Sequence, residues 1–433
     1  MALPSLAGGN VSRHPGRFLL PVLVTLVILA TALFIFSFFG GEEIAIGNLV
    51  LRAQQGTTYP LQAPRYSFPD SRFAEPTDGE SQVPAARNVI LFIGDGMGLG
   101  QVSAASDLLD FPGSTPAMID TPHLALVRSW VIDNLAPDSA STGTAMATGF
   151  KTRKKAVGVL EDGRVVRNLF DVARDHGRAT GVITTSGVVD ATPATFTVHV
   201  EWRDDYHEIF EKMLASGTDL LIGGDWTHFS KAKKNQAYLD LLARAEELGQ
   251  EHGYQVIRDP SLIDTTELPL LALFPPRPSG GNSHGPPLAA TALRAIELLR
   301  EDPDGFLLLV ECEITDEFGH SNDIEEVMNG MRELNDAVAA VLEATEGDGE
   351  TLVVVAADHD TGTLAVVDGD YEEGRATVRW ATGDHSSQWL PLFAFGPGAE
   401  RFTGVLDNTE VGQLIARALG LEPFPQLADF VEN

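Results

Sequence analysis

Six short apolar segments alternate with longer segments of helical pattern, and this alternation constrains the fold more than any other feature of the chain. The helical periodicity is clear at residues 168–177, 238–253, 288–302 and 323–347. Strands that alternate with helices form a parallel sheet with helices on both faces. We therefore predict an α/β fold with a doubly wound, largely parallel central sheet, and functional residues at the carboxyl ends of its strands. The predicted strands are residues 88–94, 179–185, 219–224, 306–311, 351–357 and 391–396.

An uncharged apolar run, residues 18–39, lies near the N-terminus. It is long enough to cross a bilayer as a helix, for which about 20 residues suffice. Arg13 and Arg17 precede it and Glu42 follows it, so the N-terminus is expected in the cytoplasm and the rest of the chain outside. A cleaved signal peptide is the alternative, but the run exceeds the usual apolar length of about 7–15 residues and no small-x-small site directly follows. We favour a membrane anchor with a periplasmic or extracellular domain; cleavage would give a secreted protein.

Composition and net charge limit the partners and the metal sites that this chain can have, and composition along the chain divides it into segments. The formal net charge of -31 argues against nucleic acid as a partner. The one cysteine, Cys312, excludes an intrachain disulfide and a cysteine-based zinc site, so any metal must be held by His, Asp and Glu. The expected segments are a cytoplasmic N-terminus (1–17), a transmembrane anchor or signal (18–39), a linker or arm rich in Pro, Gln, Ser and Thr (40–86), the α/β domain (87–423) and a tail (424–433).

Acidic and imidazole side chains occur at the predicted strand ends. Asp95 lies in the sequence GDGMG directly after the first strand; this turn is not a G-x-G-x-x-G motif, because the spacing fails. Asp316 and His320 have the i,i+4 spacing that puts two metal ligands on one helix face. Four carboxylates would meet in one cleft if these strand ends converge: Asp95, Glu311, Asp316 and Asp358. At about 6 Å and an effective dielectric constant near 20, each pair would repel by roughly 3 kcal/mol, so we expect several metal ions to bind there. The other candidate ligands are Glu311, Asp358, His359 and His385.

Ser139 lies in the small-residue sequence DSASTGTAMATG, behind the helix-start residues Pro137 and Asp138. A serine in the first helical turn is surrounded by free backbone N–H groups at the positive end of the helix dipole. Both favour an alkoxide and an attached phosphate. An ordinary Ser/Thr-rich helix cap is the alternative for this stretch taken alone.

With these residues in view, the chain resembles the alkaline phosphatase family. The motifs NVILFIGDGMG, DSASTGTAMATG, DATPA, ADHD and the GDH before the last core strand occur in the family's order, over about residues 87–422. The resemblance implies hydrolysis of phosphate monoesters through a phosphoserine, with broad specificity and a preference for alkaline pH. It also implies two Zn²⁺ and one Mg²⁺. By the same resemblance Ser139 is the nucleophile and Arg203 holds the phosphate oxygens.

The resemblance also implies a ligand set. The first zinc is assigned Asp316, His320 and His385, and the second Asp95, Asp358 and His359. The magnesium is assigned Asp95, Thr192 and Glu311, with Asp190 reaching it through water.

Several alternatives and departures remain. A phosphodiesterase or sulfatase-like hydrolase on the same bimetal core is the rival activity, and a non-catalytic surface protein that binds metal or phosphate is the rival class. Arg203 could instead be a surface ion-pair residue. Glu317 stands where better-known members carry lysine or histidine, which leaves the pH profile open. The segments between the motifs look too short for large insertions, so a homodimer is allowed for but not assigned an interface. His123, His199, His207 and His284 are interpreted as structural.

Overall fold

A computed structural model describes residues 44–46, 49–51, 85–110, 115–225, 234–275, 285–370, 372 and 374–428. The chain contains two compact units, Met1–Ala63 and Pro64–Asn433. In the first, β1 (Ile44–Ile46) pairs antiparallel with β2 (Leu49–Leu51). The apolar run 18–39 lies outside the described residues, and among the described ones no helix has the length and apolar character needed to cross a membrane.

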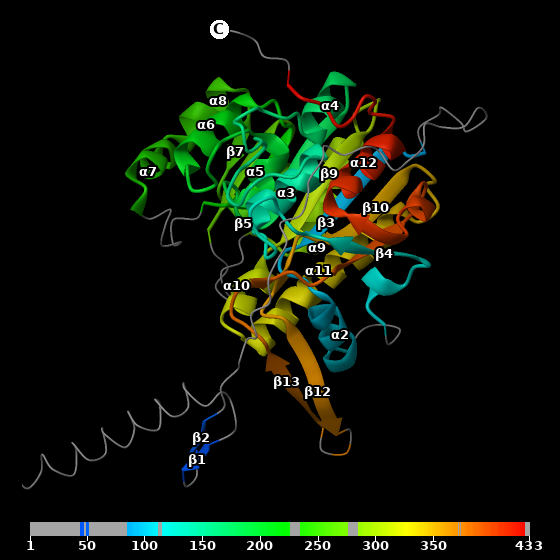
Figure 1. Ribbon diagram of the computed structural model, residues 1–433. Helices are drawn as coiled ribbons and strands as arrows, with labels where there is room; N and C mark the ends of the chain where they lie inside the picture. The colour runs from blue at the N-terminus through cyan, green and yellow to red at the C-terminus, as the bar shows by residue number, and fades with distance from the viewer. Residues whose placement is uncertain are drawn as a thin grey trace, which may run out of the picture. The chain divides into compact units, whose positions relative to one another are not determined.

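The second unit is built on a ten-stranded sheet (Figure 1). All neighbouring strands run parallel except at β15, which is antiparallel to both of its neighbours, β10 and β4. Across the sheet the strands are β16 (Gly404–Asp407), β4 (His123–Arg128), β15 (Leu390–Phe395), β10 (Thr351–Ala357), β3 (Asn88–Gly94), β9 (Phe306–Cys312), β5 (Ala179–Gly187), β6 (Leu220–Gly224), β8 (Leu270–Phe274) and β7 (Gln255–Ile257).

Helices cover both faces of this sheet, as right-handed crossovers between parallel strands require. On one face lie α2 (Leu99–Leu108), α9 (Leu288–Leu299) and α11 (Ile324–Thr345). On the other lie α3 (Ser139–Thr148), α4 (Leu169–Asp175), α5 (Ala191–Thr197), α6 (Tyr206–Ala215) and α12 (Asn408–Leu419).

Smaller elements complete the unit. They are α7 (Gln236–Ala243) and α8 (Ala245–Glu251) beside the β7 edge, α10 (Ile314–His320), the 3-10 turns Ala117–Ile119, Pro260–Thr265 and Ala399–Arg401, the pair β11 (Asp360–Thr361) with β14 (His385–Ser386), and the hairpin β12 (Leu364–Asp370) with β13 (Arg375–Trp380).

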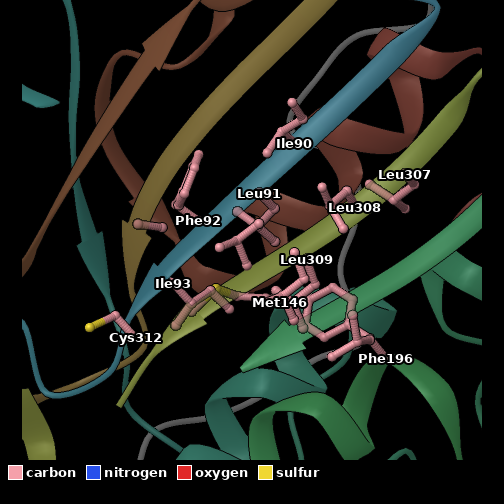
Figure 2. Close-up of a cluster of buried hydrophobic side chains, with 14 of the residues drawn as sticks. Ile90, Leu91, Phe92, Ile93, Met146, Phe196, Leu307, Leu308, Leu309 and Cys312 are labelled. Atoms are coloured by element: carbon pink, nitrogen blue, oxygen red, sulfur yellow. The ribbon is translucent and has the colours of Figure 1, made fainter. Parts of the chain in front are cut away.

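The central strands form the middle of the core. Every residue of β3, β9 and β10 is buried, which is why these strands are continuously apolar rather than alternating. Figure 2 shows Ile90–Ile93 of β3 and Leu307–Leu309 of β9 in one buried cluster with Met146 of α3 and Phe196 of α5. The helix that begins with Ser139 is therefore anchored to the same core as the strands that carry the acidic residues.

The predicted α/β class and its mostly parallel sheet are confirmed. All six predicted strands are present, and their ends differ from the prediction by two residues at most. The predicted helix 238–253 is two short helices, α7 and α8, which meet at Arg244. The prediction missed β4, β7, β8 and β16; β7 has only three residues and β16 only four, which is too short for a clear strand pattern.

Candidate active site

The functional side chains gather at the edge of the sheet where the parallel strands end. Asp95 follows β3, Glu311 lies in the last residues of β9, and Asp358 follows β10. Residue 385 precedes β15 rather than following it, but β15 is antiparallel, so its start lies at this same edge. The strand ends therefore bring together residues that are far apart in the sequence.

Ser139 is the first residue of α3, as predicted. Asp138 caps the helix: its carboxylate accepts a 3.2 Å bond from the Ser141 backbone N–H, and its own N–H donates to the Ser141 hydroxyl. The helix lies close to α5, because a Cβ on Gly143 would come within 2.6 Å of the Thr195 hydroxyl. The small-residue sequence thus lets α3 pack tightly and fixes the position of the Ser139 hydroxyl.

Arg203 and His359 both lie within hydrogen-bond distance of that hydroxyl. Oγ of Ser139 is 3.2 Å from Nε2 of His359, and Nη1 of Arg203 donates to it over 3.4 Å. Arg203 also pairs with Asp190 at 3.0 Å and with Asp138 at 3.4 Å. Burial alone would lower the pKa of the guanidinium, but these two carboxylates raise it above its ordinary value. Arg203 is therefore held charged beside the Ser139 hydroxyl rather than lying as a surface ion pair.

Asp316, His320 and His385, which the resemblance assigns to one zinc, lie close together. Nε2 of His385 lies 3.4 Å and Nε2 of His320 3.5 Å from the two oxygens of Asp316, and the two Nε2 atoms are 3.2 Å apart. Each ring has its Nδ1 2.8 Å from a backbone carbonyl oxygen, of Gly383 for His320 and of Pro137 for His385. An Nδ1–H donated to a carbonyl leaves Nε2 as the acceptor, which is the tautomer a metal ligand needs.

A second group consists of Asp95, Asp358 and His359. Nε2 of His359 lies 3.3 Å from Asp95 and 3.2 Å from Asp358, and one ligand atom from each residue falls within 4.8 Å of the others. A ligand atom of His359 also lies within 4.8 Å of ligand atoms of Asp316 and His385, so His359 adjoins both groups. Oδ1 of Asp95 and Oδ2 of Asp358 are buried and have no hydrogen bond within the part of the chain that the structure describes.

The charges of this second group fit a cation. Burial and the charge of Asp358 hold the pKa of Asp95 well above its ordinary range, and burial with Asp316 raises that of Asp358 to about 7. Burial lowers the pKa of His359, so its imidazole is neutral. Buried carboxylate oxygens and a neutral imidazole nitrogen are donor atoms that a divalent cation can bind.

Thr192 and Glu311 form a third group beside Asp190. Oε2 of Glu311 accepts from the Thr184 hydroxyl, while its Oε1 and the Thr192 hydroxyl are buried with no hydrogen-bond partner among the described residues. Burial and the neighbouring Asp190 raise the pKa of Glu311 to about 8. Oxygen donors alone suit a hard cation such as Mg²⁺.

A cavity of about 770 Å³ opens over Ser139. Sequence reasoning missed several residues that line it, among them Glu313, Lys154, Lys155 and Tyr206. Of these four residues, only Glu313 could have been found from the sequence, because it follows the candidate ligand Glu311 by two residues.

The structure describes several of the residues to which the sequence analysis gave no catalytic or metal-binding role. His199 pairs with Asp171 at 2.9 Å, Cys312 is buried, and His284 lies outside the described residues. Glu317 lines the cavity, and burial with Asp316 raises its pKa to about 7. Asp360 is buried and accepts hydrogen bonds from Thr363 and Ser386, so it holds the loop that carries His385.

Comparisons with known proteins all point to one family. A family model described as alkaline phosphatase matches residues 86–374. Alkaline phosphatase of Escherichia coli (strain K12) is 29% identical over 418 residues, covering 80% of this chain and 88% of that protein. Streptomycin-6-phosphate phosphatase of Streptomyces griseus is 31% identical over 423 residues, covering 80% and 94%. The structure of alkaline phosphatase from the Antarctic bacterium TAB5 is 28% identical with a TM-score of 0.68, covering 78% and 99%. A variant of the TAB5 enzyme with a histidine replaced by aspartate has Mg bound in its M3 site.

Proposed function

Because this chain belongs to the alkaline phosphatase family, we propose that the cavity over Ser139 is its phosphomonoesterase centre. Metal-dependent hydrolysis of phosphate monoesters is the family's function, and the chain is such an enzyme. The observation that carries the placement is the position of the Ser139 hydroxyl, 3.2 Å from His359 and 3.4 Å from Arg203. The Ser139 hydroxyl therefore lies beside His359, one of the candidate metal ligands, and beside the charged guanidinium of Arg203.

The donor groups described above fit two Zn²⁺ and one Mg²⁺. We assign the first zinc to Asp316, His320 and His385, because their nitrogen and oxygen atoms converge. The second is assigned to Asp95, Asp358 and His359. Asp95, Thr192 and Glu311 are assigned to magnesium, with Asp190 reaching it through water, because this set offers only oxygen.

In the proposed reaction, Oγ of Ser139 loses its proton to solvent and attacks the phosphorus of the substrate. The bond to the leaving oxygen breaks, and that oxygen takes up a proton as the alcohol departs. Arg203 binds two phosphoryl oxygens with its planar guanidinium and orients them in line with the attacking hydroxyl. Divalent cations at the three sites would favour the serine alkoxide and neutralise the charge of the phosphoryl group.

Water then attacks the phosphoserine on the side from which the alcohol departed, releasing inorganic phosphate and restoring the Ser139 hydroxyl. Two in-line displacements retain the configuration at phosphorus. Because the named groups bind only the phosphoryl part, we propose broad specificity for the alcohol, with an alkaline preference. None of the described contacts favours a diesterase, a sulfatase-like hydrolase or a non-catalytic binder over this reaction.

The test is Ser139→Ala, assayed with an aryl phosphate. We expect turnover to fall by about 1000-fold or more, while zinc and magnesium contents stay unchanged. Ser103→Ala is the matched control, because Ser103 is exposed on α2. Wild-type protein mixed with inorganic phosphate at acid pH should carry one phosphoryl group on the peptide that contains Ser139. Full activity in Ser139→Ala would refute the assignment.

We also propose that residues 18–39 anchor the enzyme in a membrane, with the catalytic domain outside the cytoplasm as a monomer or a homodimer. The support is the length of the apolar run and its flanking charges. Detergent-free fractionation tests the anchor: all activity in the soluble fraction, at a processed mass, would show a cleaved signal. Light scattering of the purified enzyme gives the oligomeric state.

A further inference from the structure

Lys155 lies in a β-turn at the wall of the cavity over Ser139. The backbone N–H of Ala156 donates to the carbonyl oxygen of Arg153 over 3.4 Å, so Lys154 and Lys155 are the two central residues of the turn. Lys155 has a φ of 69°. Glycine or asparagine usually occupies a turn position with positive φ, because larger side chains are strained there. A lysine held in this conformation indicates that the surrounding contacts impose it.

The backbone of Lys155 makes hydrogen bonds to two residues of the proposed phosphoryl site. Its N–H donates to the carboxylate of Asp138, with distances of 3.1 Å and 3.2 Å to the two oxygens. Its carbonyl oxygen accepts from the backbone N–H of Arg203 over 2.9 Å. Asp138 caps the helix that begins with Ser139. Lys155 therefore links the cap of that helix to the segment that carries the arginine.

The side chain of Arg203 closes a ring with these backbone bonds. Its Nη1 lies 3.4 Å from Oδ2 of Asp138 and 3.4 Å from Oγ of Ser139. A change of φ at Lys155 rotates the N–H of this residue relative to its carbonyl group. With an ordinary negative φ, Lys155 could not keep both bonds unless Arg203 moved relative to Asp138.

The ammonium group of Lys155 makes weaker contacts with the same segment. Its Nζ lies 3.8 Å from a carboxylate oxygen of Asp204 and 4.8 Å from the centre of the Trp202 ring. The lysine side chain is 41% exposed, and an exposed ion pair contributes little to stability. The two backbone hydrogen bonds are therefore the contacts that hold the segment of Arg203 in place.

We propose that Lys155 is a positioning residue of the phosphoryl site: its left-handed backbone holds Arg203 beside the Ser139 hydroxyl by bonding to Arg203 and Asp138 together. The inference rests on the proposed function, which assigns the phosphoryl oxygens to Arg203. Arg203 lies between α5 and α6, outside any helix or strand, so contacts with another segment have to set its position.

The test compares two substitutions of Lys155 in the full chain loaded with Zn²⁺ and Mg²⁺. Lys155→Val keeps the N–H, but its β-branched side chain disfavours positive φ. We expect it to raise the dissociation constant for inorganic phosphate, measured by equilibrium dialysis, by about tenfold, and to lower kcat/KM for an aryl phosphate by a similar factor. Lys155→Gly loses the ammonium group but adopts positive φ freely, so it should keep both quantities within about threefold of wild type.

Lys154→Val is the matched control. Lys154 is the neighbouring residue of the same turn and lines the same cavity, but it does not share the positive φ of Lys155. The control should change phosphate affinity by less than about threefold, as substitutions at partly exposed positions usually do. Metal content and circular dichroism of all these variants should match wild type.

Arg203→Ala distinguishes positioning of the arginine from a general effect on the site. If Lys155 acts through Arg203, adding Lys155→Val to Arg203→Ala should cause no further loss of phosphate affinity. A loss that persists in the double variant would overturn the inference, as would wild-type affinity in Lys155→Val or an equal loss in Lys155→Gly. Altered circular dichroism or metal content in Lys155→Val would show a role in folding and would also overturn it. Unchanged phosphate affinity in Arg203→Ala alone would instead show that the proposed phosphoryl site is wrong.

Discussion

Removal of the metal ions should make the stability of the enzyme depend on pH through Glu311. Burial and Asp190 raise the pKa of this carboxyl to about 8, whereas in the unfolded chain it ionises near 4.5. Between these values the native state holds a proton that the unfolded state has lost. The free energy of unfolding therefore falls as the pH rises toward the native pKa.

The size of the effect follows from the width of the pH window. The histidines of the unfolded chain are half neutral at about pH 6.5 and nearly all neutral at about pH 8, so the buried, neutral His359 contributes only a small opposite change, which wild type and a Glu311 variant share. From pH 6.5 to the native pKa of about 8 is about 1.5 units. At about 1.4 kcal/mol per unit, Glu311 accounts for a loss of about 2 kcal/mol.

The assay is urea unfolding at pH 6.5 and pH 8 in the presence of a chelator, followed by circular dichroism. Between pH 6.5 and pH 8 the free energy of unfolding of Glu311→Gln should fall by about 2 kcal/mol less than that of wild type. Glu343→Gln, an exposed change on α11, controls for the acidic surface and should behave as wild type. Protein loaded with Zn²⁺ and Mg²⁺ should not show the loss, because bound cations keep the carboxylate ionised. The reasoning is refuted if chelated wild type and Glu311→Gln respond equally to pH.

Three further changes test other parts of the site. Arg203→Lys should lower kcat/KM by about 10–100-fold, because a lysine cannot pair two phosphoryl oxygens, and steady-state kinetics will measure it. His385→Ala should reduce zinc content by about one ion per chain, as judged by metal analysis, because the ring lies 3.4 Å from Asp316; retention of all zinc would contradict the ligand assignment. Gly143→Ala should destabilise the protein by about 1–3 kcal/mol, since its Cβ would lie 2.6 Å from the Thr195 hydroxyl, and thermal unfolding against Ser103→Ala will check this.

The proposed third metal site is where this chain differs most from a simple reading of its motifs. The resemblance placed Asp190 near the magnesium, and the structure shows Asp190 bonded to Arg203 as well. With Glu313 and Glu317 on the same cavity, the centre is more acidic than the motif residues alone suggest.

Most of the site was accessible from the sequence because its residues lie beside short, recognisable elements. Asp95 follows one buried strand and Asp358 another, and parallel strands present their carboxyl ends at one edge. Ser139 could be placed at a helix start because Asp138 is a strong capping residue and the small residues behind it can pack closely. The i,i+4 spacing of Asp316 and His320 on α10 was likewise a local feature.

Other parts of the site depended on contacts between distant segments. The direction of β15 brings His385 to the site, because only an antiparallel strand has its start at the edge where the parallel strands end. The pairing of Arg203 with Asp190 and the gathering of Glu313 near Glu311 and Asp190 also needed the folded chain. Local sequence determined which residues stand at the ends of strands and helices, because hydrophobic periodicity and capping act over a few residues. Strand order, strand direction and the meeting of side chains were decided by the tertiary structure, because they result from packing between segments far apart in the chain.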